Sequence, residues 1–291
     1  MRIGVAFPTT EIGNRPADIR TFAREVEAMG YDFVTCIDHV VQSPVPATPD
    51  WRSYYTLDNA FHEIMVLLGF IAGATERLGL ATAILIGPQR QTALMAKQYA
   101  ELDVLTGGRV RAGLGIGWNK VEFDALGQDF RVRARRLEEQ IALLRRFWTE
   151  PRVSFEGQWD RVDDVGINPL PVQRPIPIWI GAFEPPAVRR AGRLADGLFL
   201  NPRIKPEQQA RDTVALFHEA AREAGRDPST LGLDVTIFTE GRTADALREE
   251  YEGWRALGPT HLTVRTMSAG YTSVGAHLEA LARARDALPV V

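Results

Sequence analysis

The stretch from Leu105 to Asn119 reads LTGGRVRAGLGIGWN and is the starting point for predicting the fold. Two glycines turn the chain into a short apolar strand, in which Gly113, Gly115 and Gly117 alternate with larger residues. Alternate residues of a strand point to the same face, so the three glycines share one face. Glycine weakens a strand interior, so this pattern indicates either a flat, bulky ligand against the backbone or crowding inside a closed barrel. The spacing alone does not separate these two explanations.

Strand-like and helical patterns alternate along the whole sequence. Eight strand–helix units in 291 residues predict an α/β fold of the (β/α)8 TIM-barrel type better than an open doubly wound sheet, and we expect residues 1–291 to form a single domain. Between the fourth and fifth strands, we expect an inserted helix and a small hairpin with the sequence VSFEGQWDRV. The eight expected strands are Arg2–Phe7, Phe33–Ile37, Leu80–Leu85, Val110–Gly115, Ile176–Ile180, Gly197–Leu200, Leu233–Phe238 and His261–Val264.

Composition narrows the class of protein. With 45% hydrophobic and 24% charged residues, the chain is typical of globular proteins, and its formal charge of −3 gives no electrostatic basis for binding nucleic acid or an anionic membrane. Cys36 is the only cysteine, which favours a reducing cytoplasm. The start of the chain lacks the apolar core of a signal peptide. The longest apolar run, Ile64 to Ala74, is shorter than the roughly 20 residues that span a bilayer.

Candidate site residues lie where strands end, because TIM-barrel active sites form at the carboxyl ends of the strands. Asp38 and His39 follow the second strand, and His39 is the only histidine of five at such a position. An imidazole titrates near neutrality, so His39 could exchange a proton beside a redox cofactor, or it could only bond loop backbone. Asp38 could hold a polar cofactor edge or cap the next turn.

Two further features of the strand ends are candidates for binding. Gly181–Ala182 precede a helix start, whose free N–H groups suit a phosphate, although glycine is also common there for steric reasons. The long loop from Val40 to Asp58 carries aromatic residues that could wall a substrate pocket or only fix the loop in place. These aromatic residues are Trp51, Tyr54 and Tyr55.

Several kinds of chemistry lack their usual motif. No His-x-His, His-Glu-x-x-His or cysteine pair is present, so we expect no metal. The nucleophile elbow and the Walker phosphate loop are missing, and the Gly-x-Gly-x-Gly of the fourth strand lacks the dinucleotide-binding spacing. A cofactor-free lyase would need a lysine at a strand end, whereas Lys97, Lys120 and Lys205 fall on helices or loops. We therefore expect the chain to bind an organic cofactor that supplies the chemistry.

Three stretches together resemble the luciferase-like flavin and deazaflavin oxidoreductases. They are GYDFVTCIDHV at Gly30–Val40, AKQYAELDVLTGGRVRAGLGIGWNKVEFDALG at Ala96–Gly127, and NPLPVQRPIPIWIGAFEPPAVRRAGRLADGLF at Asn168–Phe199. The segment GWNxxEFxALG is most similar to the subgroup that uses coenzyme F420, a 5-deazaflavin, rather than FMN. The resemblance implies a luciferase-like barrel with the tricyclic ring at its C-terminal mouth.

The resemblance also implies roles for individual residues. Asp38 and His39 match the cofactor-side pair, in which the histidine lies beside the ring and can act in proton transfer. Ala83–Ile84 match a bulge that often has a cis non-proline bond behind the ring. The loop under the cofactor corresponds to Gly117, Trp118 and Asn119, and the phosphate-side turn to Gly181 and Ala182. Trp118 stands where sugar-phosphate dehydrogenases of the family have a glutamate, which argues against sugar-phosphate oxidation.

The implied activity is F420-dependent hydride transfer to or from a small, apolar or conjugated organic substrate, with His39 as acid or base. One alternative is an FMN-dependent monooxygenase that receives reduced flavin from a separate reductase. Another is a barrel that binds the flavin or deazaflavin without catalysis. The resemblance further implies a homodimer, for which the hairpin around Phe155–Trp159 is a candidate contact. Arg90 and Arg203 could meet an anionic group of cofactor or substrate, or be solvated.

Overall fold

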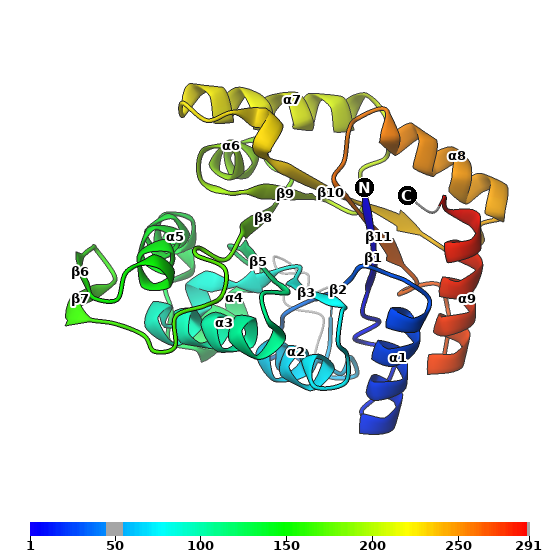
Figure 1. Cartoon of the computed structure of the whole chain (residues 1–291), viewed down its shortest axis with the longest axis horizontal. Coiled ribbons are helices and arrows are strands. Elements are labelled where there is room, and N and C mark those ends of the chain that lie inside the picture. Colours follow the sequence, from blue (N-terminus) through cyan, green and yellow to red (C-terminus); the bar gives the residue numbers. More distant parts are fainter. Residues whose placement is uncertain (45–54, 290–291) are drawn as a thin grey trace.

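The computed structural model describes residues 1–44 and 55–289, and within them the strands form a closed parallel barrel (Figure 1). The sheet order is β3-β2-β1-β11-β10-β9-β8-β5-β4, and pairing of β3 with β5 closes it. β3 and β4 are two pieces of one barrel strand, which gives the eight predicted strands. Their bounds are β1 (Arg2–Ala6), β2 (Phe33–Cys36), β3 (Gly79–Thr82), β4 (Leu85–Ile86), β5 (Val110–Gly115), β8 (Ile178–Ala182), β9 (Gly197–Leu200), β10 (Gly232–Phe238) and β11 (His261–Arg265).

Helices surround the barrel, and most of them bury an apolar face against it (Figure 1). The core between the two layers includes large side chains that are almost completely buried, among them Phe22, Tyr99, Trp148 and Trp254. No helix in the described ranges combines the length and the apolar character needed to cross a membrane. The helices are α1 (Pro16–Ala28), α2 (Ile64–Ala72), α3 (Thr92–Thr106), α4 (Lys120–Ala125), α5 (Arg133–Thr149), α6 (Pro185–Leu194), α7 (Gln208–Glu223), α8 (Ala244–Arg255) and α9 (Val274–Ala287).

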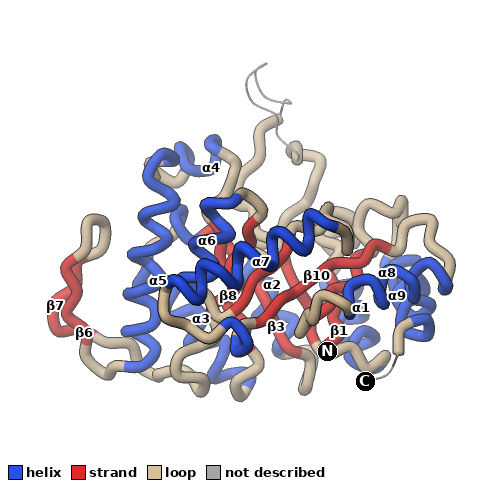
Figure 2. Tube along the Cα trace, turned by 90° about the horizontal axis from the view of Figure 1, so that it is seen from above, coloured by secondary structure: helices blue, strands red, loops and turns tan. Residues whose placement is uncertain are grey.

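The insertion between the fourth and fifth barrel strands is confirmed. It contains α4, α5 and an antiparallel hairpin of β6 (Val153–Glu156) and β7 (Arg161–Val165), which projects from the barrel (Figure 2). The carboxylate of Glu139 on α5 accepts hydrogen bonds of 2.6–2.8 Å from three backbone N–H groups of the hairpin turn, residues 158–160. The turn is therefore fixed to α5. That the whole chain forms a single domain stays a prediction.

The third barrel strand is interrupted at Ala83–Ile84, where the peptide bond is cis, as the resemblance implies. Ala81 of β3 pairs with Arg111 of β5, and Leu85 of β4 pairs with Leu114. Three residues thus lie between the paired positions on the third strand and two on β5, which defines a bulge of one residue. The bulge turns both Ala83 and Ile84 toward the barrel interior, where they pack against Trp179 and Phe199.

An ion pair occupies the centre of the barrel, where aliphatic layers are usual. The Arg111 guanidinium donates to Asp234 across 2.8 Å, and Thr263 donates to the other carboxylate oxygen at 2.8 Å. Arg111 also lies 4.4–4.7 Å from the ring centroids of three aromatic residues. These rings, from Phe33, Trp179 and Phe199, contribute cation–π attraction that partly compensates for the lost hydration of the guanidinium.

Candidate active site at the C-terminal mouth of the barrel

A cavity of about 470 Å³ opens at the carboxyl ends of the strands, within the usual size range of small-molecule sites. Its lining has two chemically different sides. The side formed by the bulge, β5 and β8 is smooth and apolar, with Ile84 at its centre. The other part, from β2, β10 and β11, carries hydroxyl groups and a carboxylate, namely Thr35, Asp234, Thr236 and Thr263.

The strand glycines create the smooth side. A Cβ atom on Gly115 would lie 2.4 Å from the Ile84 side chain, and a Cβ on Gly181 would lie 2.8 Å from it. Gly117 has a φ of +70°, which favours glycine, and a Cβ there would lie 2.7 Å from Ile86. Gly113 lies deeper, where a Cβ would be 1.8 Å from the Thr82 carbonyl oxygen. Crowding therefore accounts for all three strand glycines, and Gly115 and Gly117 also line the cavity.

His39 is held by a carboxylate that is distant in the sequence. Its Nδ1 lies 2.9 Å from Oε2 of Glu122 on α4, and both side chains are buried. The other oxygen of Glu122 accepts the Val40 backbone N–H at 2.7 Å. Burial alone would raise the pKa of Glu122, but the hydrogen bonds and charge of His39, together with Val40, lower it below its usual value. The ionised carboxylate can only accept, so Nδ1 of His39 is the donor in this hydrogen bond.

Asp38, next to His39, is engaged on both of its oxygens. One accepts the Ile86 backbone N–H at 3.0 Å and the other accepts from Arg90 at 2.7 Å, while Arg90 also reaches Glu63 at 3.1 Å. Burial raises the pKa of Asp38, although Arg90 and the Ile86 N–H oppose this effect. Asp38 therefore fixes the strand beyond the bulge, and Arg90 is bound within the protein.

Aromatic rings surround the imidazole of His39. The centroids of Tyr55, Phe61 and Trp118 lie 4.9–5.4 Å from that of His39. Trp118 also lines the cavity, so its ring contacts His39 and borders the cavity as well. Trp51 and Tyr54, the other predicted pocket residues, lie outside the described residues.

The predicted cofactor residues fall into two groups. Asp38, His39 and Asn119 do not themselves line the cavity, and the Asn119 amide donates to the Val41 carbonyl at 3.5 Å. The others line the cavity: Ala83, Ile84, Gly117, Trp118, Gly181 and Ala182. The roles of both groups toward a cofactor stay predictions.

Sequence reasoning missed several charged residues of the site, of which three are described here. Glu122 lies within the quoted segment GWNxxEFxALG, so the sequence carried a signal for it. Arg133, at the start of α5, and Arg265, at the end of β11, both line the cavity. Arg133 donates to the carbonyl oxygens of Phe130 at 2.8 Å and Gly117 at 3.3 Å. Its guanidinium is therefore oriented beside the glycine loop.

The helix start after Gly181–Ala182 offers few donors for a phosphate. Pro185 and Pro186 open α6 and carry no N–H, and the next two N–H groups bond the Glu184 carbonyl. Glu184, which carries a carboxylate, lines the same end of the cavity. Arg133 is thus the better-placed cation for an anionic group there. Within residues 1–44 and 55–289, no cluster of His, Cys, Asp and Glu could hold a metal ion.

Comparison with known proteins agrees with this geometry. The chain is 27% identical to the F420-dependent glucose-6-phosphate dehydrogenase of Kineococcus radiotolerans over 94% of its length and 77% of that protein. It is 40% identical to the FMNH(2)-dependent dimethylsulfone monooxygenase of Pseudomonas putida, over 50% of this chain and only 41% of that one. The structure of an F420-dependent secondary alcohol dehydrogenase with an F420–acetone adduct shares the fold, with a TM-score of 0.81, 20% identity and 99% coverage of both chains. The model of the family described as luciferase-like monooxygenase matches residues 1–288, and the chain belongs to this family.

Proposed function

We propose that this protein is an F420-dependent oxidoreductase that transfers a hydride between the deazaflavin and a small, apolar or conjugated organic substrate. The observation that carries the proposal is the buried His39–Glu122 pair beside an apolar, glycine-lined cavity at the barrel mouth. A relative that aligns with 94% of the chain is named for F420, which supports the choice of cofactor.

The residues at the mouth fit a flat ring system. Side chains on Gly115 and Gly181 would fill the space that the Ile84 side chain uses, so the glycines leave one smooth wall for a planar group. Ile84, Gly117 and Trp118 would contact the ring, and Arg133 would meet a phosphate. When bound, the deazaflavin supplies a hydride donor or acceptor and favours two-electron chemistry.

His39 would move the proton that accompanies the hydride. Glu122 holds the proton on Nδ1, so Nε2 is the nitrogen that can accept a proton from a substrate or return one to it. The buried carboxylate also stabilises the imidazolium formed in that step. Tyr55, Phe61 and Trp118 limit the access of water to the ring.

The apolar wall supports an apolar or conjugated substrate. Trp118 lines the cavity where a sugar-phosphate dehydrogenase would need an acid, so we do not extend the substrate of the Kineococcus relative to this chain. The runner-up is an FMN-dependent monooxygenase with a separate reductase, which the 40% identity over half of the chain supports. A non-catalytic binding protein is less favoured, because it has no need of the His39–Glu122 pair.

Titration of the purified protein with F420 and with FMN, followed by fluorescence quenching, tests the proposal. We expect F420 to bind more tightly, and Arg133→Ala to weaken its binding by about tenfold through loss of a charge-assisted contact. Arg131→Ala is the matched control, because Arg131 lies two residues away with its side chain 88% exposed. Tighter binding of FMN would favour the monooxygenase, and binding of neither would overturn the proposal. Hydride transfer with wild-type F420 affinity in His39→Asn would contradict the role of His39.

We also propose a cytoplasmic homodimer, with reduced cofactor supplied by a separate enzyme. Cys36 is buried and free, as suits a reducing compartment. The adjacent helices α2 and α3 expose apolar side chains, with Val66 at 72% and Leu105 at 71% exposure. A Val66→Glu variant should lower the molar mass measured by light scattering, whereas Val165→Glu on the hairpin should not. The opposite result would assign the contact to the hairpin.

A further inference from the structure

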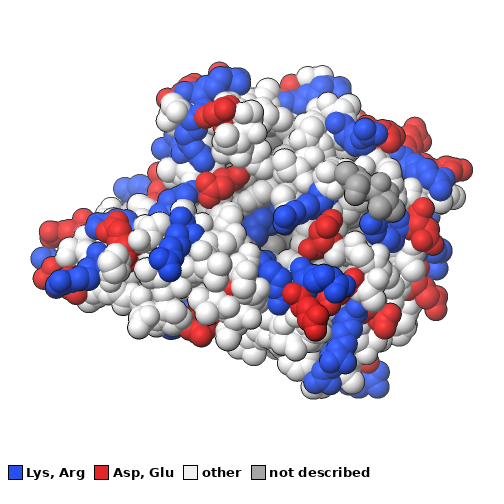
Figure 3. Space-filling model, in the orientation of Figure 1, with Lys and Arg blue, Asp and Glu red and all other residues white. Residues whose placement is uncertain are grey.

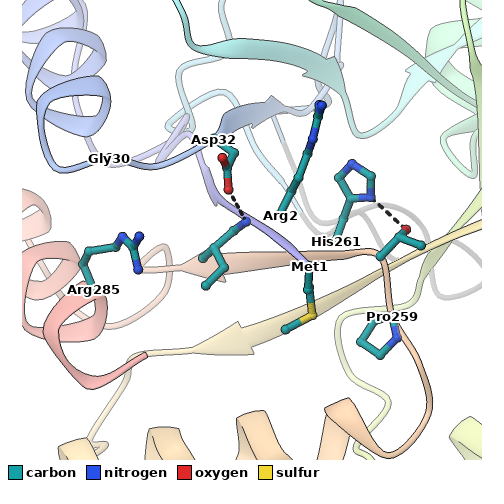
Figure 4. A pocket seen from close by; sticks show the side chains of 9 residues that line it. Met1, Arg2, Gly30, Asp32, Pro259, His261 and Arg285 are labelled. Atoms are coloured by element: carbon teal, nitrogen blue, oxygen red, sulfur yellow. Dashed lines mark hydrogen bonds between the residues drawn. The ribbon is translucent and has the colours of Figure 1, made fainter. Parts of the chain in front are cut away.

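The opposite, N-terminal mouth of the barrel holds a second space, which no step of the proposed reaction uses. Two adjoining cavities of about 690 and 440 Å³ share Arg2, Asp32 and His261 in their walls. Figure 4 shows the larger one, with Arg2 and His261 on one side and Arg285 of α9 on the other. We call the two together the N-terminal recess.

Positive charge dominates the N-terminal recess. Among the described residues that line it, Asp32 contributes the single carboxylate, and one of its oxygens already accepts the Ile3 backbone N–H at 2.7 Å. Figure 3 shows this face of the molecule, where Lys and Arg side chains gather around a hollow near the barrel axis. Five arginines line the recess: Arg2, Arg77, Arg109, Arg111 and Arg285.

Most of this charge is not neutralised by contacts inside the recess. Arg111 is paired with Asp234 within the barrel. Arg109 is fixed by bonds to uncharged oxygens, including the Leu78 carbonyl at 2.7 Å. In Arg285, the buried Nε and Nη1 atoms have no hydrogen-bond partner among the described residues. The recess therefore presents fixed and partly desolvated cationic groups, which attract anions strongly.

Burial and the surrounding positive charge both act on His261. Burial, followed by the charges of Arg111 and Arg2, lowers its pKa to about 3, so the imidazole is neutral at physiological pH. Its Nδ1 lies 2.9 Å from the Thr260 hydroxyl, and its ring packs against Trp179 at 4.9 Å. A neutral imidazole can contribute an N–H to an anion without adding charge.

We propose that the N-terminal recess is a binding site for a small oxyanion, namely the phosphate or carboxylate group of a metabolite, held by Arg2, Arg285 and His261. An anion there would accept from Arg2 and His261, which are register partners on the neighbouring strands β1 and β11, and would balance part of the positive charge of the recess. This site is at the other end of the barrel from the proposed cofactor and stands independently of its identity.

The test is a titration of the full chain with inorganic phosphate, with sodium acetate as the carboxylate arm and sodium chloride at matched ionic strength as the reference. The ring signals of His261 in heteronuclear NMR spectra report binding at the site itself. At neutral pH, where phosphate and acetate are both charged, we expect phosphate to shift these signals in a saturable way, because the neutral imidazole donates an N–H to it. Arg2→Ala and Arg285→Ala should each weaken phosphate binding by about fivefold or more.

Two controls separate a site from general screening. Arg2→Lys keeps the charge and should retain most of the binding, and Arg161→Ala removes an exposed arginine of the distant hairpin and should change nothing. Matching urea unfolding curves establish that the variants fold. The proposal is overturned if chloride shifts the His261 signals as phosphate does, or if Arg161→Ala weakens binding as much as Arg2→Ala.

Discussion

Arg111 and Asp234 form an ion pair of 2.8 Å on the boundary between the two ends of the barrel. Arg111 lines the N-terminal recess, and Asp234 lines the cavity at the C-terminal mouth. Thr263 and three aromatic rings complete the surroundings of the pair. The N-terminal recess and the cavity at the C-terminal mouth are thus separated by an ion pair in which each charged group compensates the other.

Removal of one partner should therefore lower the free energy of unfolding more than removal of both. Asp234→Leu leaves the Arg111 guanidinium buried without a carboxylate, and we expect the free energy of unfolding to fall by about 3–5 kcal/mol. The double variant Arg111→Met/Asp234→Leu should recover most of that loss, because it also removes the charge that needs compensation. Urea unfolding measures both, and a double variant as unstable as the single one would contradict this account.

Glu122→Gln should impair catalysis more than folding. The amide can still accept from Nδ1 of His39, but it carries no charge to stabilise the imidazolium. We expect kcat/KM to fall by roughly 10²-fold, with the acidic limb of the pH–rate profile moved to lower pH. Cofactor affinity should stay within about twofold of wild type, since Glu122 lies behind the cavity wall. An unchanged pH profile would leave Glu122 as a structural residue only.

Gly113→Ala should be strongly destabilising, because its Cβ would lie 1.8 Å from the Thr82 carbonyl oxygen and the backbone there is fixed in the barrel. We expect a loss of about 3 kcal/mol or more in the free energy of unfolding. Gly69→Ala is the matched control, since Gly69 lies inside α2 and a Cβ added there would have no neighbouring atom within 4 Å outside its own helix. That change should stabilise the protein by about 0.5–1 kcal/mol. Equal effects on thermal unfolding would refute the steric argument.

His277 should make stability depend on pH. Burial lowers its pKa to about 4, and its Nδ1 is hydrogen-bonded to the Thr266 hydroxyl at 2.8 Å. The unfolded chain binds a proton near pH 6.5, so the free energy of unfolding should fall between about pH 6.5 and 4, by on the order of 2 kcal/mol for this group. His277→Gln removes the titration, and its unfolding free energy should fall less steeply across that window. A parallel decline in both proteins would show that other groups are responsible.

The strand ends could be predicted because each strand and helix carries its own local pattern. The alternation of short apolar runs with helical segments located all eight barrel strands, and the resemblance placed the bulge at Ala83–Ile84. The contacts that orient side chains could not be predicted in the same way. His39 and Glu122 are 83 positions apart, and Arg111 and Asp234 are 123 apart, so their pairing depends on how the barrel closes.

The residues that follow Gly181–Ala182 weaken the prediction of a phosphate site there. A glycine before a helix suggested a phosphate site at Gly181–Ala182, but Pro185 and Pro186 remove two of the N–H groups that such a site uses. The prolines were visible in the sequence, whereas the position of Arg133 beside Gly117 required the folded chain. The Arg133→Ala variant tests which group contacts a phosphate.

The extra residue at the bulge has a consequence for the whole third barrel strand. Side chains of a regular strand alternate strictly between inside and outside, so one inserted position inverts the parity of everything beyond it. Ala81 accordingly packs inside the barrel, while Leu85, four residues later, packs outside among the helices. Deletion of a single residue at 83–84 would return the strand to one phase and turn Leu85 inward. The number of residues at the bulge, as much as their identity, therefore decides which side chains of this strand face the candidate site.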